Sequence, residues 1–194
     1  MSDSPGGREH RTITRGERTI YDNEWVRLTL VDIEPPHGQR FEHHVVHMKP
    51  VAIAVLMSKR NEVLMLRRHR FATDEWGHEL LGGLVEVGEE PAATAAREAV
   101  EESGYRPLGP PRHLTTFQPL PGMVDAPINV FLWREFEKVS EPTDAEEAGE
   151  LRWVPLAEVP HLIATGDVLG AGTIVALLQL IALDHGVDVT QSSA

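Results

Sequence analysis

One segment, residues 83–105, constrains this chain more than any other. It reads GLVEVGEEPAATAAREAVEESGY. Pro91 follows two glutamates, which suits the first turn of a helix, because a missing N–H costs nothing there and acidic side chains meet the positive end of the helix dipole. Five alanines between positions 92 and 99 are strong helix formers, and Gly104 stands where a helix ends in a left-handed residue. The segment therefore predicts a loop, a helix and a second loop.

The predicted helix carries three carboxylates on one face. Glu98, Glu101 and Glu102 stand at positions i, i+3 and i+4, and like charges at this spacing repel by about 0.2 to 0.5 kcal/mol per pair in water. Arg97 offsets part of that repulsion through Glu101. A cluster that costs stability suggests a ligand, and carboxylate oxygens are what Mg²⁺ prefers, with Mn²⁺ as a substitute. The alternative is an acidic helix face that contacts only water.

The same segment fits the pattern G-x5-E-x7-R-E-U-x-E-E-x-G-U at every fixed position, where U is apolar or aromatic. At about 7% per fixed position, seven residues match by chance at roughly one start point in 10⁸, which excludes coincidence. The segment resembles the Nudix box, with which Nudix hydrolases hold Mg²⁺ against a diphosphate that they hydrolyse. The resemblance implies Glu98 and Glu102 as the principal metal ligands, with Glu101 assisting.

The resemblance also implies supporting residues around the metal. The backbone carbonyl of Gly82 is a further candidate ligand, Glu89 lies near the metal shell, and Arg97 orients neighbouring carboxylates. A plain helix-surface role is the alternative for Arg97. When metal ions are bound, they neutralise charge on the bridging phosphates and lower the pKa of bound water. Glu102 therefore counts as catalytic as well as metal-binding.

The base that activates the water is expected in an acidic loop. In the resembled family a glutamate before the last strand takes this role, and the loop here reads EPTDAEEAGELRWVP. Glu146 is the first choice and Glu147 the second, while Glu150 stands close to the start of the strand. An acidic loop that contacts only water is the alternative for either glutamate.

The sequences before and after the box indicate a subfamily. VLMLRRHRFATDEWGHELLGGLVEVGE resembles a stretch of ADP-ribose pyrophosphatases, in which an arginine-rich strand end leads to a W-E-L-P-A-G-like segment, and QPLPGMVDAPINVF resembles their S-P-G segment. The resemblance implies a nucleoside diphosphate substrate, first of all ADP-ribose, which would give AMP and ribose 5-phosphate. Leu81 and Gly82 replace the usual Pro-Ala, Ala126 replaces an acidic residue, and Leu120 replaces a small polar one.

These departures keep two other functions open. Leu120 and Ala126 could reshape the pocket for a nucleotide sugar such as ADP-glucose or GDP-mannose. The second alternative is a sensor that binds a nucleotide without cleaving it. Such a sensor is expected to lose box carboxylates or to carry an additional DNA-binding domain, and the sequence shows neither.

Four residues are candidates for substrate contacts. Arg67 and Arg70 match the arginines of the resembled strand end, and guanidinium groups suit phosphate or a terminal ribose. Trp25 and Trp76 offer aromatic faces on which adenine could stack. The alternatives are a solvated turn for the arginines and core packing for the tryptophans. Arg68 is assigned to the turn.

Histidines at positions 43, 44 and 47 invite interpretation as a metal site. Alternation along a strand places His44 on the face opposite His43, and one strand seldom supplies a whole site. They are therefore expected to be ordinary strand residues.

Composition limits the other classes of function. The net charge of −12 over 194 residues argues against nucleic acid as the main partner. The chain has no cysteine, which excludes disulfides and thiolate nucleophiles and is compatible with the cytoplasm. The start MSDSPGGREHR has no apolar signal region, and the apolar run from Ile174 to Leu183 is too short to cross a bilayer.

The chain predicts strands first and helices later. Strands are expected at 18–21, 25–33, 42–48, 113–118, 128–134 and 151–154, a buried hairpin from 51–57 and 63–66, and a helix over 172–185. This order indicates an α/β (α+β) domain, and the resemblance implies the Nudix fold, a mixed sheet sandwiched between helices. The expected parts are a flexible tail over 1–17, an N-terminal antiparallel β element over 18–48, the hydrolase domain over 49–185 and a second tail over 186–194. The resemblance further implies a homodimer formed through the N-terminal strands.

Overall fold

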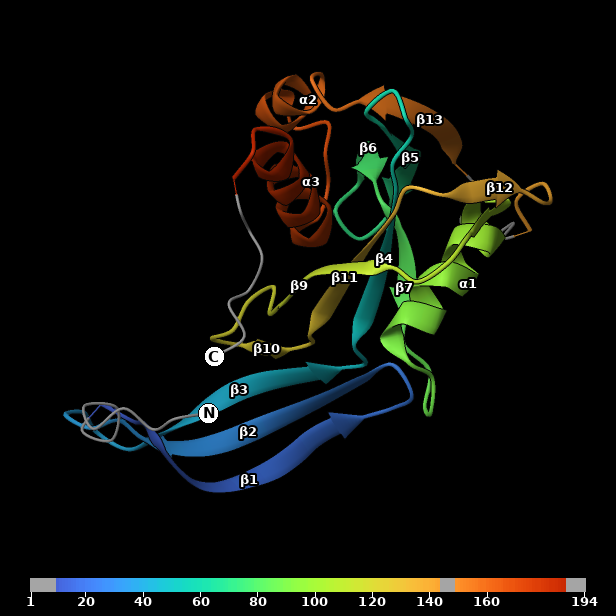
Figure 1. Ribbon diagram of the computed structural model, residues 1–194. Coiled ribbons are helices and arrows are strands. Elements are labelled where there is room, and N and C mark those ends of the chain that lie inside the picture. The colour runs from blue at the N-terminus through green and yellow to red at the C-terminus, as the bar shows by residue number, and fades with distance from the viewer. Residues whose placement is uncertain (1–9, 144–148, 188–194) are drawn as a thin grey trace. The chain divides into compact units, whose positions relative to one another are not determined.

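The computed structural model describes residues 10–143 and 149–187, and Figure 1 shows the path of the chain. The chain divides into two compact units. Among the described residues, 10–49 and 120–126 form the first, and 50–119, 127–143 and 149–187 form the second. The sequence predicted an N-terminal element that ends at residue 48, so the return of residues 120–126 to this unit is an addition to that prediction.

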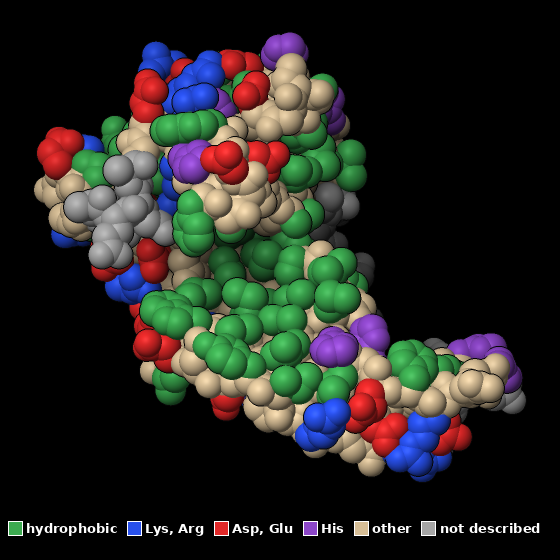
Figure 2. All heavy atoms as spheres, turned by 180° about the vertical axis from the view of Figure 1, so that it is seen from behind, with side chains coloured by type: hydrophobic (Ala, Val, Ile, Leu, Met, Phe, Trp, Pro, Cys, Tyr) green, Lys and Arg blue, Asp and Glu red, His purple; other side chains and the backbone are tan. Residues whose placement is uncertain are grey.

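The first unit is one four-stranded sheet in the order β1-β2-β3-β10. The first three strands are antiparallel, whereas β10 runs parallel to β3. The backbone N–H of Val46 donates to the Met123 carbonyl oxygen at 2.9 Å, which ties the returning segment to β3. Figure 2 shows hydrophobic side chains gathered on one face of this sheet. The strands are β1 (Ile13–Asp22), β2 (Val26–Glu34), β3 (Phe41–Met48) and β10 (Val124–Asp125).

The prediction of a flexible tail up to residue 17 is wrong for its last five residues, because β1 begins at Ile13. All ten residues of β1 are exposed, and its N-terminal half contains little apolar pattern. Backbone pairing with β2 does not require apolar side chains, and cross-strand charge helps to align it. Arg15 and Glu34, for example, form an ion pair at 2.8 Å between nitrogen and oxygen.

The second unit contains three sheets and three helices among its described residues. One sheet has the order β7-β4-β11-β9, another has the order β13-β5-β6, and β12 pairs with β8. Their strands are β4 (Val51–Leu56), β5 (Glu62–Arg70), β6 (Glu75–Glu79), β7 (Leu81–Leu84), β8 (Tyr105–Pro107), β9 (Arg112–Phe117), β11 (Ile128–Trp133), β12 (Phe136–Lys138) and β13 (Glu150–Pro155). The helices are α1 (Pro91–Ser103), α2 (Val159–Thr165) and α3 (Ala171–Asp184). The mixed α+β class predicted from the sequence is confirmed.

The predicted hairpin of two apolar runs is wrong. β4 lies between β7 and β11, whereas β5 lies between β13 and β6. A single bridge between Met57 and Val63 joins the ends of the two runs. Each run is apolar on both faces because each strand is central in its own sheet and covered on both sides. Uniform apolarity of this kind carries no information about the pairing partner.

Alternation along β4 separates two apolar cores. Ala52, Ala54 and Leu56 pack with Ala95 and Ala99 of α1. The intervening side chains belong to the other core, which α3 completes: Ile53, Val55, Ala176, Leu177 and Leu180. The small alanines let α1 approach β4 and β7 closely, so the loop and helix of the box are held against the sheet. No described helix has an apolar stretch long enough to cross a membrane.

Gly104 supports a stability prediction because its φ is 72° and a Cβ there would overlap the Ser140 carbonyl oxygen. Gly109 has a similar φ of 68° with open space around it, so it is a matched control. We expect Gly109→Ala to lower the free energy of unfolding by about 1 kcal/mol and Gly104→Ala by about 3 kcal/mol, since overlap adds to backbone strain. Urea denaturation measures both, and equal losses would contradict the proposed close approach.

Candidate active site

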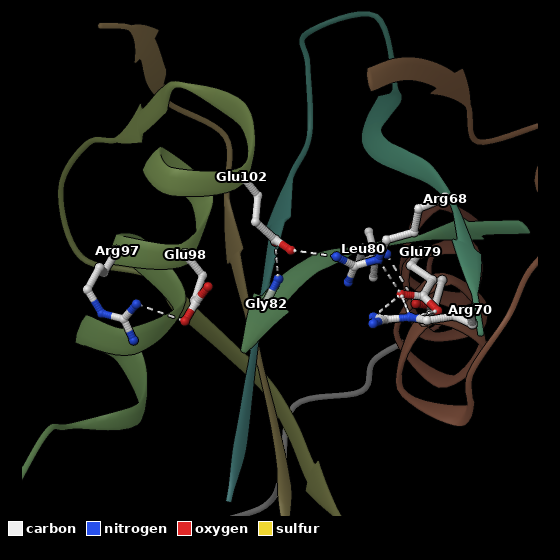
Figure 3. Close-up of polar contacts among 9 residues, drawn as sticks. Arg68, Arg70, Glu79, Leu80, Gly82, Arg97, Glu98 and Glu102 are labelled. Atoms are coloured by element: carbon white, nitrogen blue, oxygen red, sulfur yellow. Dashed lines mark hydrogen bonds and ion pairs between the residues drawn. The ribbon is translucent and has the colours of Figure 1, made fainter. Parts of the chain in front are cut away.

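The helix α1 forms where the sequence predicted it. Pro91 occupies its first turn, and Gly104 ends it in the left-handed conformation, with its N–H donating to the Val100 carbonyl oxygen at 2.7 Å. No side chain caps its N-terminus. Ala95 and Ala99 lie on its buried face. The glutamates of the box are thereby placed beside β7, and Figure 3 shows Glu98 and Glu102 extending from α1 toward that strand.

Glu102 is the most deeply buried carboxylate of the box, with 1% of its side chain exposed. Its Oε1 accepts a hydrogen bond from Arg68 Nη1 at 3.1 Å, and its Oε2 accepts one from the Gly82 backbone N–H at 2.7 Å. Burial raises the pKa of Glu102 to about 7, against the opposing effects of the Arg68 charge and the Gly82 N–H. Both carboxylate oxygens are therefore held in fixed directions.

Gly82 presents its backbone to the same place. It is paired with Ile53 in the antiparallel register of β7 and β4, but its N–H donates to Glu102 instead of to β4. Because the N–H and C=O of one strand residue point to the same edge, the Gly82 carbonyl also faces away from β4. The edge of β7 beside Glu102 therefore offers a backbone oxygen as well as a carboxylate.

Arg97 joins the other three glutamates that stand at fixed positions of the box pattern. Its Nη1 donates to Glu98 at 2.8 Å and to Glu101 at 2.7 Å, and its Nε donates to Glu89 at 3.2 Å. The hydrogen bond from Arg97 lowers the pKa of Glu89, and these carboxylates, Glu89 first, raise the pKa of Arg97 further above its usual range. The repulsion expected between the carboxylates is offset by this one guanidinium.

A second set of ion pairs lies on the other side of Glu102. Arg68 Nε donates to Glu79 Oε2 at 3.0 Å, and Arg70 binds the same carboxylate through Nε at 3.0 Å and Nη2 at 2.5 Å. Burial favours the neutral form of Glu79, but its hydrogen bonds and charge pairing with Arg70 and Arg68 outweigh burial and lower its pKa. Arg70, Glu79, Arg68 and Glu102 thus form a continuous chain of charges, which Figure 3 shows.

The assignment of Arg68 to a solvated turn is wrong, because Arg68 is in β5 and only 4% exposed. The alternation of side chains along β5 indicates the buried position of Arg68. Leu64, Leu66 and Arg68 share one face of β5, and both leucines are buried in the core that α1 covers. A guanidinium on such a face needs acidic partners, and Glu79 supplies one from the neighbouring strand β6. Glu79 stands before the box and at no fixed position of its pattern, so the motif did not mark it.

The arginines and Glu79 line a pocket of about 240 Å³ in the second unit. Its remaining wall is largely apolar and includes the first turn of α3. The lining side chains and backbone include Arg68, Arg70, Glu79, Gly82, Val51, Ile53, Ile128 and Thr173. Gly82 places one end of the pocket next to the carboxylates of the box. The pocket therefore combines a charged wall with an apolar one.

Three of the predicted substrate residues belong to the second unit, where they lie on two faces of one sheet. Arg67 lies over the ring of Trp76, with 5.2 Å from its Cζ to the ring centroid, on the face of β5 opposite Arg68 and Arg70. Trp76 is 56% exposed and Trp25 is 57% exposed, so the alternative of core packing is wrong for both. Trp25 belongs to the first unit, where Lys49 Nζ lies 5.9 Å from its ring centroid.

The predicted bases cannot be compared with the structure, because Glu146 and Glu147 lie outside the described residues. Glu150 begins β13 and is paired with Arg67 of β5 in the register of the two strands. It therefore belongs to the strand, as the sequence indicated, and not to the loop before it.

The donor set of the box suits a hard divalent cation. Glu98, Glu101 and Glu102 offer carboxylate oxygens and Gly82 a backbone oxygen, which are the ligands that Mg²⁺ and Mn²⁺ prefer. Arginines hold these carboxylates, and among the described residues no three acidic or histidine side chains already converge on one point. Binding a cation would therefore require rearrangement of at least the carboxylates held by Arg97.

The histidines of β3 make contacts within the first unit. His43 Nε2 lies 2.8 Å from the Gly122 carbonyl oxygen, and His47 Nδ1 lies 3.3 Å from Asp125. Within the described part of the chain they belong to no group that could hold a metal. All three histidines lie in the strand β3.

Comparison with known proteins agrees with this geometry. The sequence profile of the NUDIX domain matches residues 47–174, and the chain belongs to the Nudix hydrolase family. A Streptomyces rubellomurinus protein, CMP-5'-(N-acetyl-N-hydroxy-3-aminopropyl)phosphonate hydrolase, is 45% identical over 89% of this chain and 84% of its own length. An ADP-ribose pyrophosphatase from Bacillus subtilis is 30% identical over 89% of this chain and 92% of its own length.

A solved structure confirms the Nudix fold. The chain is similar to the crystal structure of an ADP compounds hydrolase with a TM-score of 0.76, at 19% identity, covering 93% of this chain and 97% of that one. The family and its relatives make the chain an enzyme, a Nudix pyrophosphohydrolase that acts on nucleotide derivatives. Nudix hydrolases typically use a divalent metal.

Gly83 allows a test of the position of Glu98. A Cβ at Gly83 would overlap the Glu98 carboxylate, which is the far end of a flexible side chain. We expect Gly83→Ala to displace Glu98 and weaken Mn²⁺ binding by about tenfold or more, while the free energy of unfolding changes by less than about 1 kcal/mol. Calorimetric titration with Mn²⁺ and urea denaturation measure the two quantities.

Gly16→Ala in β1 is the control, because a Cβ there meets nothing within 4 Å. If folded Gly83→Ala protein binds Mn²⁺ as tightly as the wild type, metal binding does not depend on the position that Glu98 has in this structure.

Proposed function

We propose that this enzyme cleaves the phosphoanhydride bond between a nucleoside 5'-monophosphate and a second phosphorus group, with Mg²⁺ as its cofactor and Mn²⁺ as a substitute. The observation that carries the proposal is the arrangement at the edge of β7. There the buried Glu102 and the neighbouring Glu98 bring carboxylate oxygens to the backbone of Gly82 and Gly83, and Gly82 also lines the pocket. Glu98 and Glu102 are the proposed principal ligands, with Glu101 and the Gly82 carbonyl assisting.

A bound divalent cation neutralises charge on the phosphates and makes water a better nucleophile. The residues of the chain hold the reactants around it. Arg97 keeps Glu89, Glu98 and Glu101 together, and Arg70 presents a guanidinium to the pocket, which suits an anionic group of the substrate. Water attacks one phosphorus atom and the other phosphate leaves. Glu146 is the proposed base and Glu147 the second choice.

A cytidine 5'-monophosphate joined to a phosphonate is the first candidate substrate. It is supported by the relative of 45% identity, whose name specifies such a compound. Cleavage of the anhydride would release CMP and the free phosphonate, leaving the carbon–phosphorus bond intact. Leu120 and Ala126, where this chain departs from the pattern of ADP-ribose pyrophosphatases, favour a substrate other than ADP-ribose.

ADP-ribose is the second candidate. Relatives named ADP-ribose pyrophosphatase are 30% and 28% identical, in Bacillus subtilis and Mycobacterium tuberculosis. The exposed ring of Trp76 under Arg67 offers a stacking surface for a base. Cleavage would give AMP and ribose 5-phosphate. A nucleotide sugar is a further alternative, because proteins named GDP-mannose pyrophosphatase are 27% identical over 70% of this chain.

The substrate is identified by assaying all candidates at equal concentration with Mg²⁺. We expect the highest kcat/KM for a CMP-linked phosphonate, with CMP as a product, and a lower value for ADP-ribose, ADP-glucose and GDP-mannose. A higher value for ADP-ribose would reverse the order of the two candidates. Binding without release of any mononucleotide, with Mg²⁺ or Mn²⁺, would contradict the proposed reaction.

Neutralising a proposed metal ligand tests the site itself. We expect Glu98→Gln and Glu102→Gln each to lower kcat by at least about 10²-fold, because a lost charge on the ligand set removes several kcal/mol of stabilisation from the transition state. Glu137→Gln is the matched control, since Glu137 is an exposed glutamate of β12 with 52% of its side chain exposed. Activity of either box variant close to that of the control would contradict the assignment.

We also propose that the enzyme is a homodimer formed through the first unit. β1 is an edge strand with ten exposed residues, and unpaired strand edges favour pairing with a second chain. Large apolar side chains in this unit are exposed, namely Ile13, Ile20, Tyr21, Trp25, Phe41 and Met48.

Analytical ultracentrifugation tests the dimer. We expect the full chain, of 21.5 kDa, to sediment with twice that mass, and Ile20→Glu with Tyr21→Glu to shift it toward monomer because charge on the paired strands opposes association. A monomeric wild-type chain at micromolar concentration would contradict the proposal.

A further inference from the structure

Arg68 is a buried cation between two carboxylates. Only 5% of its side chain is exposed, and a guanidinium stays charged at any physiological pH. Its Nε donates to Glu79 at 3.0 Å and its Nη1 donates to Glu102 at 3.1 Å. The planar fork of the guanidinium thus spans from β6 to α1, and two of its nitrogens have fixed acidic partners.

Glu79 fixes one end of this bridge. Its side chain is 12% exposed, and it pairs with both Arg70 and Arg68. These two cations together lower its pKa in spite of burial, so Glu79 is ionised. Glu79 is shared between two guanidinium groups, so it neutralises only part of the charge of Arg68. The direction of its Nη1 toward Glu102 follows from an anchor that lies outside the Nudix box.

Glu102 depends on this bridge for its orientation. Its carboxylate has two hydrogen-bond partners, Arg68 on Oε1 and the Gly82 N–H on Oε2. With Arg68 removed, one oxygen of a carboxylate that is 1% exposed would lose a charged donor. A carboxylate held by one hydrogen bond can rotate about its side-chain bonds, whereas two donors from different elements define its plane.

We propose that Arg68 is a positioning residue, which holds the Glu102 carboxylate in the orientation that binds the divalent cation and couples it through Glu79 to Arg70 in the pocket. The inference rests on the proposed function in one respect, namely that Glu102 is a metal ligand. Partners that orient a ligand in this way typically change metal affinity by 10- to 100-fold when they are removed. The repulsion between Arg68 and a cation acts in the opposite direction, and the negative charge of Glu79 beside Arg68 offsets part of it.

The test measures Mn²⁺ binding to the full chain without substrate, by the electron paramagnetic resonance signal of free Mn²⁺. We expect Arg68→Met to raise the Kd for Mn²⁺ by about 10- to 100-fold. Arg68→Lys should recover part of the loss, because an ammonium group supplies the charge but not the fork that reaches both carboxylates. Glu79→Gln should raise the Kd by a smaller factor, since it removes the anchor and leaves the contact with Glu102.

Arg152→Met is the matched control. Arg152 lies on β13, which pairs with β5, and its Nη2 donates to Glu158 at 2.6 Å. It is an arginine in an ion pair in the same sheet, but without contact to the box. We expect its Kd for Mn²⁺ to equal that of the wild type.

A purely structural role would lower the free energy of unfolding of Arg68→Met without changing the Kd of the folded protein. A wild-type Kd in folded Arg68→Met protein therefore overturns the proposal. If this variant does not fold, wild-type Kd values in both Arg68→Lys and Glu79→Gln overturn it equally.

Failure of the inference about Arg68 can be distinguished from failure of the proposed function. If the wild type binds Mn²⁺ and Arg68→Met binds it 10-fold or more weakly, the inference holds even when none of the tested nucleotides is cleaved. If the wild type binds no Mn²⁺, the inference is overturned together with the metal requirement.

Discussion

The burial of a negative charge at Glu102 is the constraint on which the rest of the site depends. A carboxylate with 1% exposure is costly unless donors surround it, and the donors here come from two different strands. Arg68 reaches it from β5 and the Gly82 N–H from β7, while α1 supplies the glutamate itself. The helix of the box is therefore fixed to the sheets by polar contacts as well as by the packing of its alanines. Burial of the Glu102 carboxylate costs stability, which is consistent with its proposed chemical role as a metal ligand.

Two arginines divide the acidic residues of the box. Arg97 lies on α1 and gathers Glu89, Glu98 and Glu101, whereas Arg68 holds Glu102 from outside the box. The sequence motif describes the first group completely because all its members lie in α1 and the loop directly before it, between residues 89 and 101. The second group joins residues 34 positions apart. Its members are adjacent only because β5 pairs with β6 and the two carboxylates reach the Arg68 guanidinium from β6 and α1.

This difference between local and non-local contacts explains which parts of the fold and of the site could be predicted from the sequence. The bounds of α1 followed from Pro91, the alanines and Gly104, since local sequence determines where a helix begins and ends. The strand β1 was missed up to residue 17 because its exposed side chains lack an apolar pattern. The apolar runs of β4 and β5 were identified as strands, but their partners were not, because pairing is a non-local choice. Arg68 was missed although its alternation with Leu64 and Leu66 indicated a buried position.

The residues that bind charge are also separate from the residues that could select the substrate. The box and its arginines specify where charge can be neutralised, and they are independent of the nucleobase. Arg70 lines the pocket with Glu79, while Arg67 of β5 and Trp76 of β6 lie on the opposite face of the sheet that these strands form. The second unit therefore offers two separate surfaces to a nucleotide, and we expect the specificity of the enzyme to depend on which of them the nucleotide contacts.

The position of the metal tests this description of the site most directly. A crystal of the full chain soaked in Mn²⁺ would give an anomalous difference map. We predict a peak bounded by Glu98, Glu102 and the carbonyl oxygen of Gly82, with Arg68 still in contact with Glu102. A peak at any other place, or a Glu102 carboxylate turned away from the metal, would contradict the proposed site.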